Sequence, residues 1–409
     1  MRRIVLYILL FTGIQVCADG LDADQPRWNT NTILMEDTTT WVGRMQRQVD
    51  SLINLPLFET TQLGLYVYDL TAGRDLVCVN HRQRMRPASC EKVVTAVAAL
   101  KTLGNDYKFR TQMFVAGEVR DSVLWGDIYF VGGMDPMLSQ GELYQLARGL
   151  NQAGIDSIAG IIGLDLSKKD ADEMGWGWCW DDKTVPLRPL TVDSRDCFTQ
   201  EFLSDLESAG IRGMDVSRVV QMPCPTSALL FGEITHTIDQ VLQRMMKKSD
   251  NFYAESVFYQ IAALSGKKNA TRKDAMPFFH QLITEVGLTP SHYQIADGSG
   301  LSLYNYVSPE LLVSLLSYAW KNEAIRPHLY SSLPIAGFDG TLEKRMRKTA
   351  ADGNIHAKTG TVDGISSLSG YATSPEGHIL VFSIINQGVI KTSMGRTFQD
   401  KVCEVLCSP

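Results

Sequence analysis

PASCEKVVTAVAAL, residues 87–100, is the stretch of sequence that decides the fold. Pro87 predicts the start of a helix, because proline is favoured in the first helical turn. The residues after Lys92 are mostly apolar, and a helix that is apolar on most sides belongs in a core. Ser89 and Lys92 are three residues apart, so their side chains share one helix face. The stretch therefore predicts a buried helix with a hydroxyl and an amine at its beginning.

Strand patterns flank this helix on both sides. Residues 63–70 and 75–80 are separated by a turn at 71–73 and predict a hairpin, and residues 366–373 and 378–386 predict a second one. Residues 355–362 favour an edge strand, and residues 396–407 a closing helix. Strands that are distant in sequence are thus available to form one sheet beside the buried helix.

The residue composition of the chain changes between residues 106 and 228. Short apolar runs and many glycines occur here, with four of the seven tryptophans between Trp125 and Trp180. We interpret residues 106–228 as an inserted domain, because the motifs on either side need each other. The surrounding domain is then expected in two parts, residues 19–105 and 229–409.

The N-terminus has the pattern of a signal peptide, assigned to residues 1–18. Arg2 and Arg3 precede an apolar run at residues 4–11, and Val16-Cys17-Ala18 resembles a cleavage site. The apolar run is short for a membrane span. A lipoprotein anchored through Cys17 is the less favoured alternative, because Val16 is large for its position. We therefore expect an exported protein, periplasmic or associated with the cell envelope.

Composition excludes several functional classes. The 409-residue chain has a net charge of −6, which argues against a nucleic-acid partner. Its seven histidines show no metal-ligand spacing, and no Gly-x-Ser-x-Gly motif is present. We therefore predict neither a metal nor a cofactor, and neither a zinc hydrolase nor a Ser-His-Asp hydrolase.

The first motif, Ser89-Cys90-Glu91-Lys92, offers a nucleophile and its base. A serine hydroxyl needs a base within hydrogen-bonding reach, and Lys92 can act only when neutral. Burial, or a nearby cation such as Lys358, would lower its pKa enough. The pattern alone is weak, since Ser265-Gly266-Lys267-Lys268 also matches it and is interpreted as a solvated turn.

The second motif, Ser249-Asp250-Asn251, follows an amphipathic helix whose apolar residues begin at Ile238. Ser249 can pass a proton between Lys92 and a leaving amine. Asn251 can donate to a substrate carbonyl and hold Lys92 in place. A plain helix cap is the alternative, since Ser, Asp and Asn all favour that position.

The third motif, Lys358-Thr359-Gly360-Thr361, lies in the predicted edge strand. Lys358 and Thr359 offer a cation and a hydroxyl to a terminal carboxylate. Gly360 would let an extended peptide pair closely with the strand. The Thr361 amide, with that of Ser89, would form an oxyanion hole. The alternative is an ordinary turn, but three motifs in this order together predict serine acyl transfer.

The chain resembles the class C low-molecular-mass penicillin-binding proteins, a family of D-Ala-D-Ala carboxypeptidases and endopeptidases. The resemblance spans roughly residues 30 to 408. Beyond the three motifs it rests on residues 126–133 with Asp135-Pro136, on Trp180-Asp181-Asp182, on residues 297–302, and on residues 333–337 and 339–342.

The resemblance implies a mixed α/β (α+β) fold of the β-lactamase/transpeptidase type. Its domain would contain a five-stranded antiparallel sheet flanked by helices, with an insertion between the first two motifs. Longer family members carry two inserted subdomains, and we expect one to be reduced or absent here. By position, Ser89 matches the acylated serine and Lys92 its base. Ser249 and Asn251 match the second motif, and Lys358, Thr359 and Gly360 the third.

The resemblance also implies the activity. The expected enzyme is a serine D-Ala-D-Ala carboxypeptidase or endopeptidase that acts on peptidoglycan stem peptides and muropeptides and is acylated by β-lactam antibiotics. Two alternatives are a class A β-lactamase, which would add a deacylating glutamate and lack a long insertion, and a non-catalytic peptidoglycan-binding protein. The sequence leaves the oligomeric state open and is compatible with a homo-oligomer.

Overall fold

The computed structural model describes residues 37–409, and the predicted signal peptide and Cys17 lie outside them. A five-stranded antiparallel sheet has the order β2-β1-β11-β10-β9. Its strands are β1 (Gln62–Asp69), β2 (Arg74–Val79), β9 (His356–Val362), β10 (Ile365–Thr373) and β11 (Ile379–Gln387). Both predicted hairpins and the predicted edge strand are confirmed.

Helices cover both faces of this sheet. One face packs against α1 (Trp41–Ile53) and α10 (Thr392–Cys407), and α10 begins four residues before the predicted Arg396. Strand β11 sends Phe382 and Ile384 into this layer, and Val381 and Ile385 into the opposite one, as the period of a strand requires. The opposite layer contains α2 (Glu91–Thr102), α5 (Ile238–Lys247), α6 (Asn251–Ala263), α7 (Arg272–Glu285), α8 (Pro309–Lys321) and α9 (Arg326–Ser332).

Helix α2 is the predicted helix and forms the centre of that layer. A short 3-10 turn, η2 (Ala88–Cys90), precedes it, and every residue from Glu91 to Leu100 is buried. Because the helix is apolar on all sides, it packs against α6, α8 and strand β9 at once. Its position within the core fixes the place of the hydroxyl and amine at its beginning.

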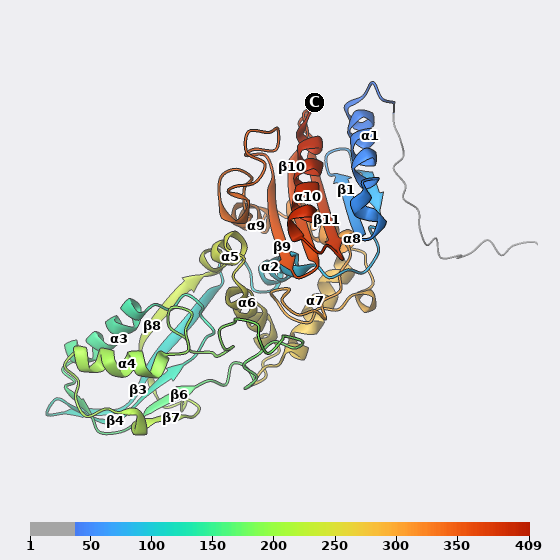
Figure 1. Ribbon diagram of the computed structural model, residues 1–409. Helices are drawn as coiled ribbons and strands as arrows, with labels where there is room; N and C mark the ends of the chain where they lie inside the picture. Colours follow the sequence, from blue (N-terminus) through green and yellow to red (C-terminus); the bar gives the residue numbers. More distant parts are fainter. Residues whose placement is uncertain (1–36) are drawn as a thin grey trace, which may run out of the picture.

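A second sheet separates the first two motifs. It has the order β7-β6-β4-β3-β8, with β5 beside β4, and α3 (Gln140–Gln152) and α4 (Phe198–Ser208) share its apolar cluster. The strands are β3 (Lys108–Arg120), β4 (Val123–Val131), β5 (Ser157–Ile158), β6 (Ile162–Asp165), β7 (Val219–Gln221) and β8 (Leu229–Thr237). Figure 1 shows two lobes, with α5 and α6 between them.

The pairing of β8 corrects one predicted domain boundary. Residues 229–237 were assigned to the surrounding domain, but β8 is antiparallel to β3, with Thr237 opposite Lys108. Strand β3 leads from the first lobe into the second, and its neighbour β8 leads back. The second sheet therefore ends at residue 237 and not at residue 228. Among residues 37–409, no helix is long and apolar enough to span a membrane.

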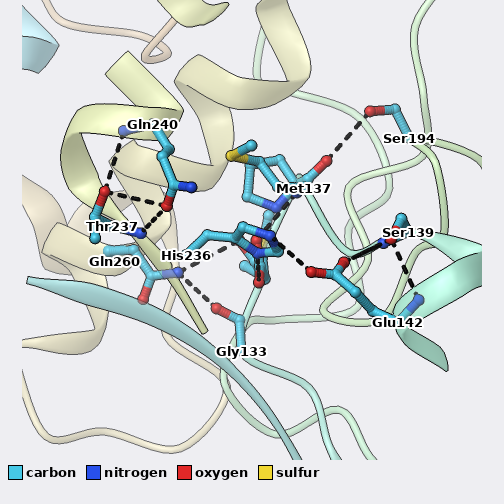
Figure 2. A network of polar contacts seen from close by, with 12 residues as sticks. Gly133, Met137, Ser139, Glu142, Ser194, His236, Thr237, Gln240 and Gln260 are labelled. Carbon is cyan, nitrogen blue, oxygen red and sulfur yellow. Dashed lines mark hydrogen bonds and ion pairs between the residues drawn. The ribbon is translucent and has the colours of Figure 1, made fainter. Parts of the chain in front are cut away.

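A polar network joins the second lobe to the first (Figure 2). His236, at the end of β8, places Nδ1 2.7 Å from Asp135 Oδ2 and Nε2 3.2 Å from Glu142 Oε1. The hydrogen bond with Asp135 raises the pKa of His236, which is almost buried. Gln260 of α6 donates to the Gly133 carbonyl at 2.6 Å. The network therefore connects a helix of the first lobe with the loop after β4.

Candidate active site

Ser89 lies on a tightly packed turn at the beginning of α2. The preceding residue, Ala88, has a positive φ of 47°, a conformation that costs energy for a side chain other than glycine. Ser367 of β10 donates to the Pro87 carbonyl at 2.5 Å. On the other side, a Cβ built on Gly300 would collide with the Ala88 carbonyl oxygen. The strained turn is thus held between β10 and the loop around Gly300, and it fixes the position of the Ser89 hydroxyl.

Lys92 is fully buried and hydrogen-bonded to the nucleophile. Its Nζ lies 3.0 Å from Ser89 Oγ, 2.7 Å from Asn251 Oδ1 and 2.7 Å from the Ser299 carbonyl oxygen. Burial lowers the pKa of Lys92 to about 8, against the opposing effect of Asp297 and other nearby carboxylates. A neutral amine is therefore accessible near neutral pH, as a general base requires.

The second motif is at once a helix cap and part of this site. Asp250 caps α6 by accepting a hydrogen bond from the Tyr253 amide at 3.4 Å. Because Lys92 occupies the amide oxygen of Asn251, the NH2 group of Asn251 is the donor left for a substrate carbonyl. Ser249 has a left-handed φ of 58° and accepts a hydrogen bond from Lys358 Nζ at 2.8 Å. Within residues 37–409, no hydrogen bond joins Ser249 to Lys92.

The third motif places a second buried ammonium group beside the first. Burial, and then the charge of Lys92, lower the pKa of Lys358 to about 7. Thr359 shares a 2.7 Å hydrogen bond with the hydroxyl of Thr341, in the 3-10 turn η5 (Gly340–Leu342). Thr361 is exposed on the same edge strand. Partly exposed hydroxyl groups therefore lie in front of buried amines.

Gly360 also lets the edge strand approach the beginning of α2 closely. A Cβ built on it would collide with Ser367 Oγ, and it would lie 2.6 Å from the Pro87 carbonyl oxygen and 3.0 Å from the Cys90 nitrogen. The missing side chain therefore lets β9 pack against the beginning of α2. The Cys90 thiol strengthens that contact by donating to the Lys358 carbonyl oxygen at 3.2 Å.

The competing Ser-x-x-Lys match is not part of the site. Ser265 lies in an exposed turn after α6, and Lys268 is also exposed. Both are far from the buried environment that lowers the pKa of Lys92. Among residues 37–409, no group of three or more His, Cys, Asp or Glu side chains could hold a metal ion.

Comparisons with known proteins identify the family. The family model for the D-Ala-D-Ala carboxypeptidase 3 (S13) family matches residues 45–194 and 188–407, nearly all of the described chain. This chain belongs to that family. Its membership agrees with the resemblance stated from the motifs, and with the mixed α/β fold of a transpeptidase-like domain.

Relatives and solved structures within and around the S13 family agree with this result. D-alanyl-D-alanine carboxypeptidase DacB of Haemophilus influenzae is 26% identical over 407 residues, covering 79% of this chain and 85% of the relative. Carboxypeptidase DacB of Mycolicibacterium smegmatis is 29% identical, covering 84% and 79%. The crystal structure of penicillin-binding protein 4 of H. influenzae has a TM-score of 0.79 and 25% identity, covering 87% of this chain and 97% of that one.

Sequence reasoning missed several residues that complete the site of this S13 member. The Ser299 carbonyl oxygen, the Thr341 hydroxyl and the buried carboxyl groups of Glu255 and Asp297 were assigned no role. A backbone carbonyl carries no sequence signal of its own. The Asp-Gly-Ser-Gly run that begins at Asp297 was visible, and two glycines beside polar residues are typical of a loop that approaches another backbone closely.

Proposed function

We propose that this protein is a serine D-Ala-D-Ala carboxypeptidase that hydrolyses peptidoglycan stem peptides through an acyl-enzyme on Ser89. The observation that carries the proposal is the 3.0 Å contact between Ser89 Oγ and the fully buried amine of Lys92. Membership of the S13 family supports the same activity. Among the described serines, Ser249 also contacts a fully buried lysine, Lys358, but that contact joins the second motif to the third and not to Lys92.

The substrate would lie along β9, the edge strand. Lys358 and Thr359 bind the terminal carboxylate of D-Ala-D-Ala, and the Asn251 amide donates to a carbonyl farther along the peptide. Because Ser249 contacts Lys358, we assign it to orienting that cation. These contacts position the penultimate carbonyl carbon next to the Ser89 hydroxyl.

The reaction then proceeds in two steps. Neutral Lys92 takes the Ser89 proton as Oγ attacks the penultimate carbonyl carbon, and the amides of Ser89 and Thr361 stabilise the oxyanion. The C–N bond breaks, Lys92 returns the proton to the leaving nitrogen, and D-Ala departs. Water hydrolyses the acyl-enzyme. When the leaving nitrogen belongs to a cross-link between two stems, the same steps make an endopeptidase.

The proposal extends to inhibitors and location. β-Lactam antibiotics would acylate Ser89, because their amide resembles the scissile bond. Substrate access requires export, so we propose a periplasmic or envelope location, reached through the signal peptide at residues 1–18.

Fluorescent penicillin labelling and release of D-Ala from a stem pentapeptide test the proposal. We expect Ser89→Ala to abolish labelling and to lower D-Ala release by about a thousandfold or more. Ser265→Ala, in the competing motif, should label like the wild type. Undiminished labelling of Ser89→Ala would remove Ser89 from the mechanism.

The lifetime of the penicilloyl adduct distinguishes the two enzyme alternatives. An adduct that persists for minutes supports a peptidase, whereas many turnovers each second would identify a β-lactamase. Mass spectrometry of digested muropeptides then separates carboxypeptidase from endopeptidase products. Binding of muropeptides without any release of D-Ala would identify a non-catalytic protein.

A further inference from the structure

Three carboxyl groups are buried around Lys92, and the reaction steps above use none of them. Glu91 of α2, Glu255 of α6 and Asp297 of the loop before Ser299 are each at most 2% exposed. Because a water-excluded region stabilises few charges, neighbouring carboxyl groups there cannot all ionise. The hydrogen-bond donors around each one decide which of them carries the negative charge.

The donors gather on Asp297. Its Oδ1 accepts from the Gly300 amide at 2.8 Å and from Asn305 Nδ2 at 2.7 Å. Its Oδ2 accepts from the Ser302 amide and from Trp178 Nε1, both at 2.7 Å, and from the Ser299 hydroxyl at 3.2 Å. Five donors therefore fix the Asp297 side chain and tie it to the loop at residues 299–305.

The other two carboxyl groups lack such support. Glu255 accepts from the Gly298 amide, at 3.1 and 3.2 Å, and burial raises its pKa to about 8 although Ser299 and the Gly298 amide oppose that shift. Neither oxygen of Glu91 has a hydrogen-bond partner among residues 37–409, and burial raises its pKa well above the usual range. Burial therefore favours the neutral forms of Glu91 and Glu255, whereas Asp297 is the carboxyl group that acts most strongly on Lys92.

One of the five donors comes from the second lobe. Trp178 belongs to the irregular segment between β6 and α4, and neighbouring contacts hold that segment against the first lobe. The ring of Trp176 lies 5.0 Å from that of Tyr304, and the Arg272 guanidinium is 4.4 Å from the Trp176 ring centre. A Cβ on Gly177 would collide with Tyr304. These contacts fix the segment that carries Trp178, so its indole N–H is held in position to donate to Asp297.

We propose that Asp297 and Trp178 are positioning residues for the acylation of Ser89. The indole N–H of Trp178 fixes the side chain of Asp297, and Asp297 orders the loop whose Ser299 carbonyl binds Lys92 Nζ at 2.7 Å. Its negative charge also makes Lys92 retain its proton more strongly. The proposal rests on the proposed role of Lys92 as base, and it makes the second lobe part of the acid–base machinery.

The direction of the effect follows from the charges that face Lys92. Asp297 opposes the effect of burial on the pKa of Lys92, so that pKa falls further when Asp297 is replaced. Lys92 then becomes neutral at lower pH, and the acidic midpoint of the acylation rate shifts to lower pH. The loosened Ser299 carbonyl also misplaces the amine, so the maximal rate falls. The groups that face Lys92 are Ser89 and Cys90 in η2, Glu91 on α2, Asp250, Asn251 and Glu255 at α6, Asp297 and Ser299 in the loop, and Lys358 on β9.

The test measures acylation of the full chain by fluorescent penicillin between about pH 5 and 9. Trp178→Phe should lower the maximal rate roughly threefold to tenfold, as loss of a hydrogen bond to a charged group implies. It should also move the acidic midpoint to lower pH. Asp297→Asn should move it further in the same direction, by about half a pH unit or more.

Two control variants separate positioning from general damage. Trp176→Phe alters the same segment without touching Asp297, and Glu91→Gln replaces a group that is already neutral, so neither should move the midpoint. If Trp178→Phe folds poorly, benzothienylalanine at position 178 keeps the ring and removes only the N–H. A midpoint equal to that of Trp176→Phe would overturn the proposal. Labelling that survives Ser89→Ala would instead overturn the proposed function.

Discussion

The α-carbon of Gly360 faces the amide nitrogen of Cys90, and a methyl group built on Gly360 would lie 3.0 Å from that nitrogen. The same methyl group would lie 2.6 Å from the Pro87 carbonyl oxygen. Both atoms belong to the backbone, so they cannot rotate away as a side chain would. The distance between the edge strand and the helix that carries Ser89 is therefore set by the absence of a single carbon atom.

Gly360→Ala should separate β9 from α2. We expect a loss of about 1–3 kcal/mol in unfolding free energy from overpacking. We also expect acylation of Ser89 to slow by roughly tenfold to a hundredfold, because Lys358 moves away from the nucleophile. Urea unfolding and penicillin labelling measure the two effects. Gly141→Ala, in an open position on α3, is the control, and acylation of Gly360→Ala at the wild-type rate would contradict the prediction.

The two buried lysines predict a bell-shaped pH dependence. Burial lowers the pKa of Lys92 to about 8 and that of Lys358 to about 7. Activity needs Lys92 neutral and Lys358 charged, which inverts the order of the two values; this form is a minor one, but its population still peaks between them and falls towards both lower and higher pH. Because the two amines interact, the two apparent values belong to the pair.

Lys358→Arg tests which amine gives the alkaline limb. A guanidinium keeps its charge throughout the accessible pH range, so the alkaline limb should disappear while the acidic limb stays. The measurement is D-Ala release as a function of pH, with Lys358→Met as the control that loses the cation. An alkaline limb that persists in Lys358→Arg would assign that limb to another group.

Ser249 has a strained backbone conformation and a hydroxyl group that contacts Lys358. Its φ of 58° is strained for a residue with a Cβ, and its hydroxyl binds Lys358. Both variants lose the hydrogen bond to Lys358, but Ser249→Gly should be more stable than Ser249→Ala by about 1 kcal/mol, because only glycine relieves the strain. Both should slow acylation similarly, since both remove the hydroxyl. Thermal unfolding and labelling provide the comparison, and equal stability of the two variants would refute the strain argument.

The His236 network should make stability depend on pH. Hydrogen bonding to Asp135 raises the pKa of His236 above its usual 6.5. The contribution of this ion pair is complete below the unfolded value near 6.5 and is lost as pH rises through the higher folded value. His236→Asn should therefore cost roughly 1–3 kcal/mol at about pH 5.5 and less at about pH 9.

Urea unfolding at the two pH values measures that difference. His292→Asn, at an exposed position, is the control and should change little at either pH. A loss for His236→Asn that grows with increasing pH would contradict the sign derived from the hydrogen bond with Asp135.

Sequence patterns predicted the parts of the fold that depend on residues close together in the sequence. The two hairpins, the buried helix after Pro87 and the edge strand of Lys358 all follow from the period and turn residues of their own segments. No strand was predicted at residues 229–237, and the pairing of β8 with β3 is a contact between distant segments that local patterns do not show.

Contacts across long sequence separations were beyond the reach of such patterns. Trp178 and Asp297 are 119 positions apart, and nothing near either residue indicates its partner. Ser249 shows the same limit, since its type and motif indicated a polar role but only the fold directs its hydroxyl to Lys358. The motifs predicted the contacts of Lys92 with Ser89 and Asn251, whereas those of Ser249 with Lys358 and of Trp178 with Asp297 were not predicted.

The pairing of β1 with β11 has a consequence for how the protein folds. Gln62 lies opposite Gln387, so β1 can pair early with β2 but meets β11 only when the two ends of the chain come together. Closing so long a loop is slow, whereas the second sheet, whose strands all lie between residues 108 and 237, can assemble from nearer segments. A chain truncated before β9 lacks the Lys358 strand entirely, so we expect it to form the second sheet without any capacity for acyl transfer.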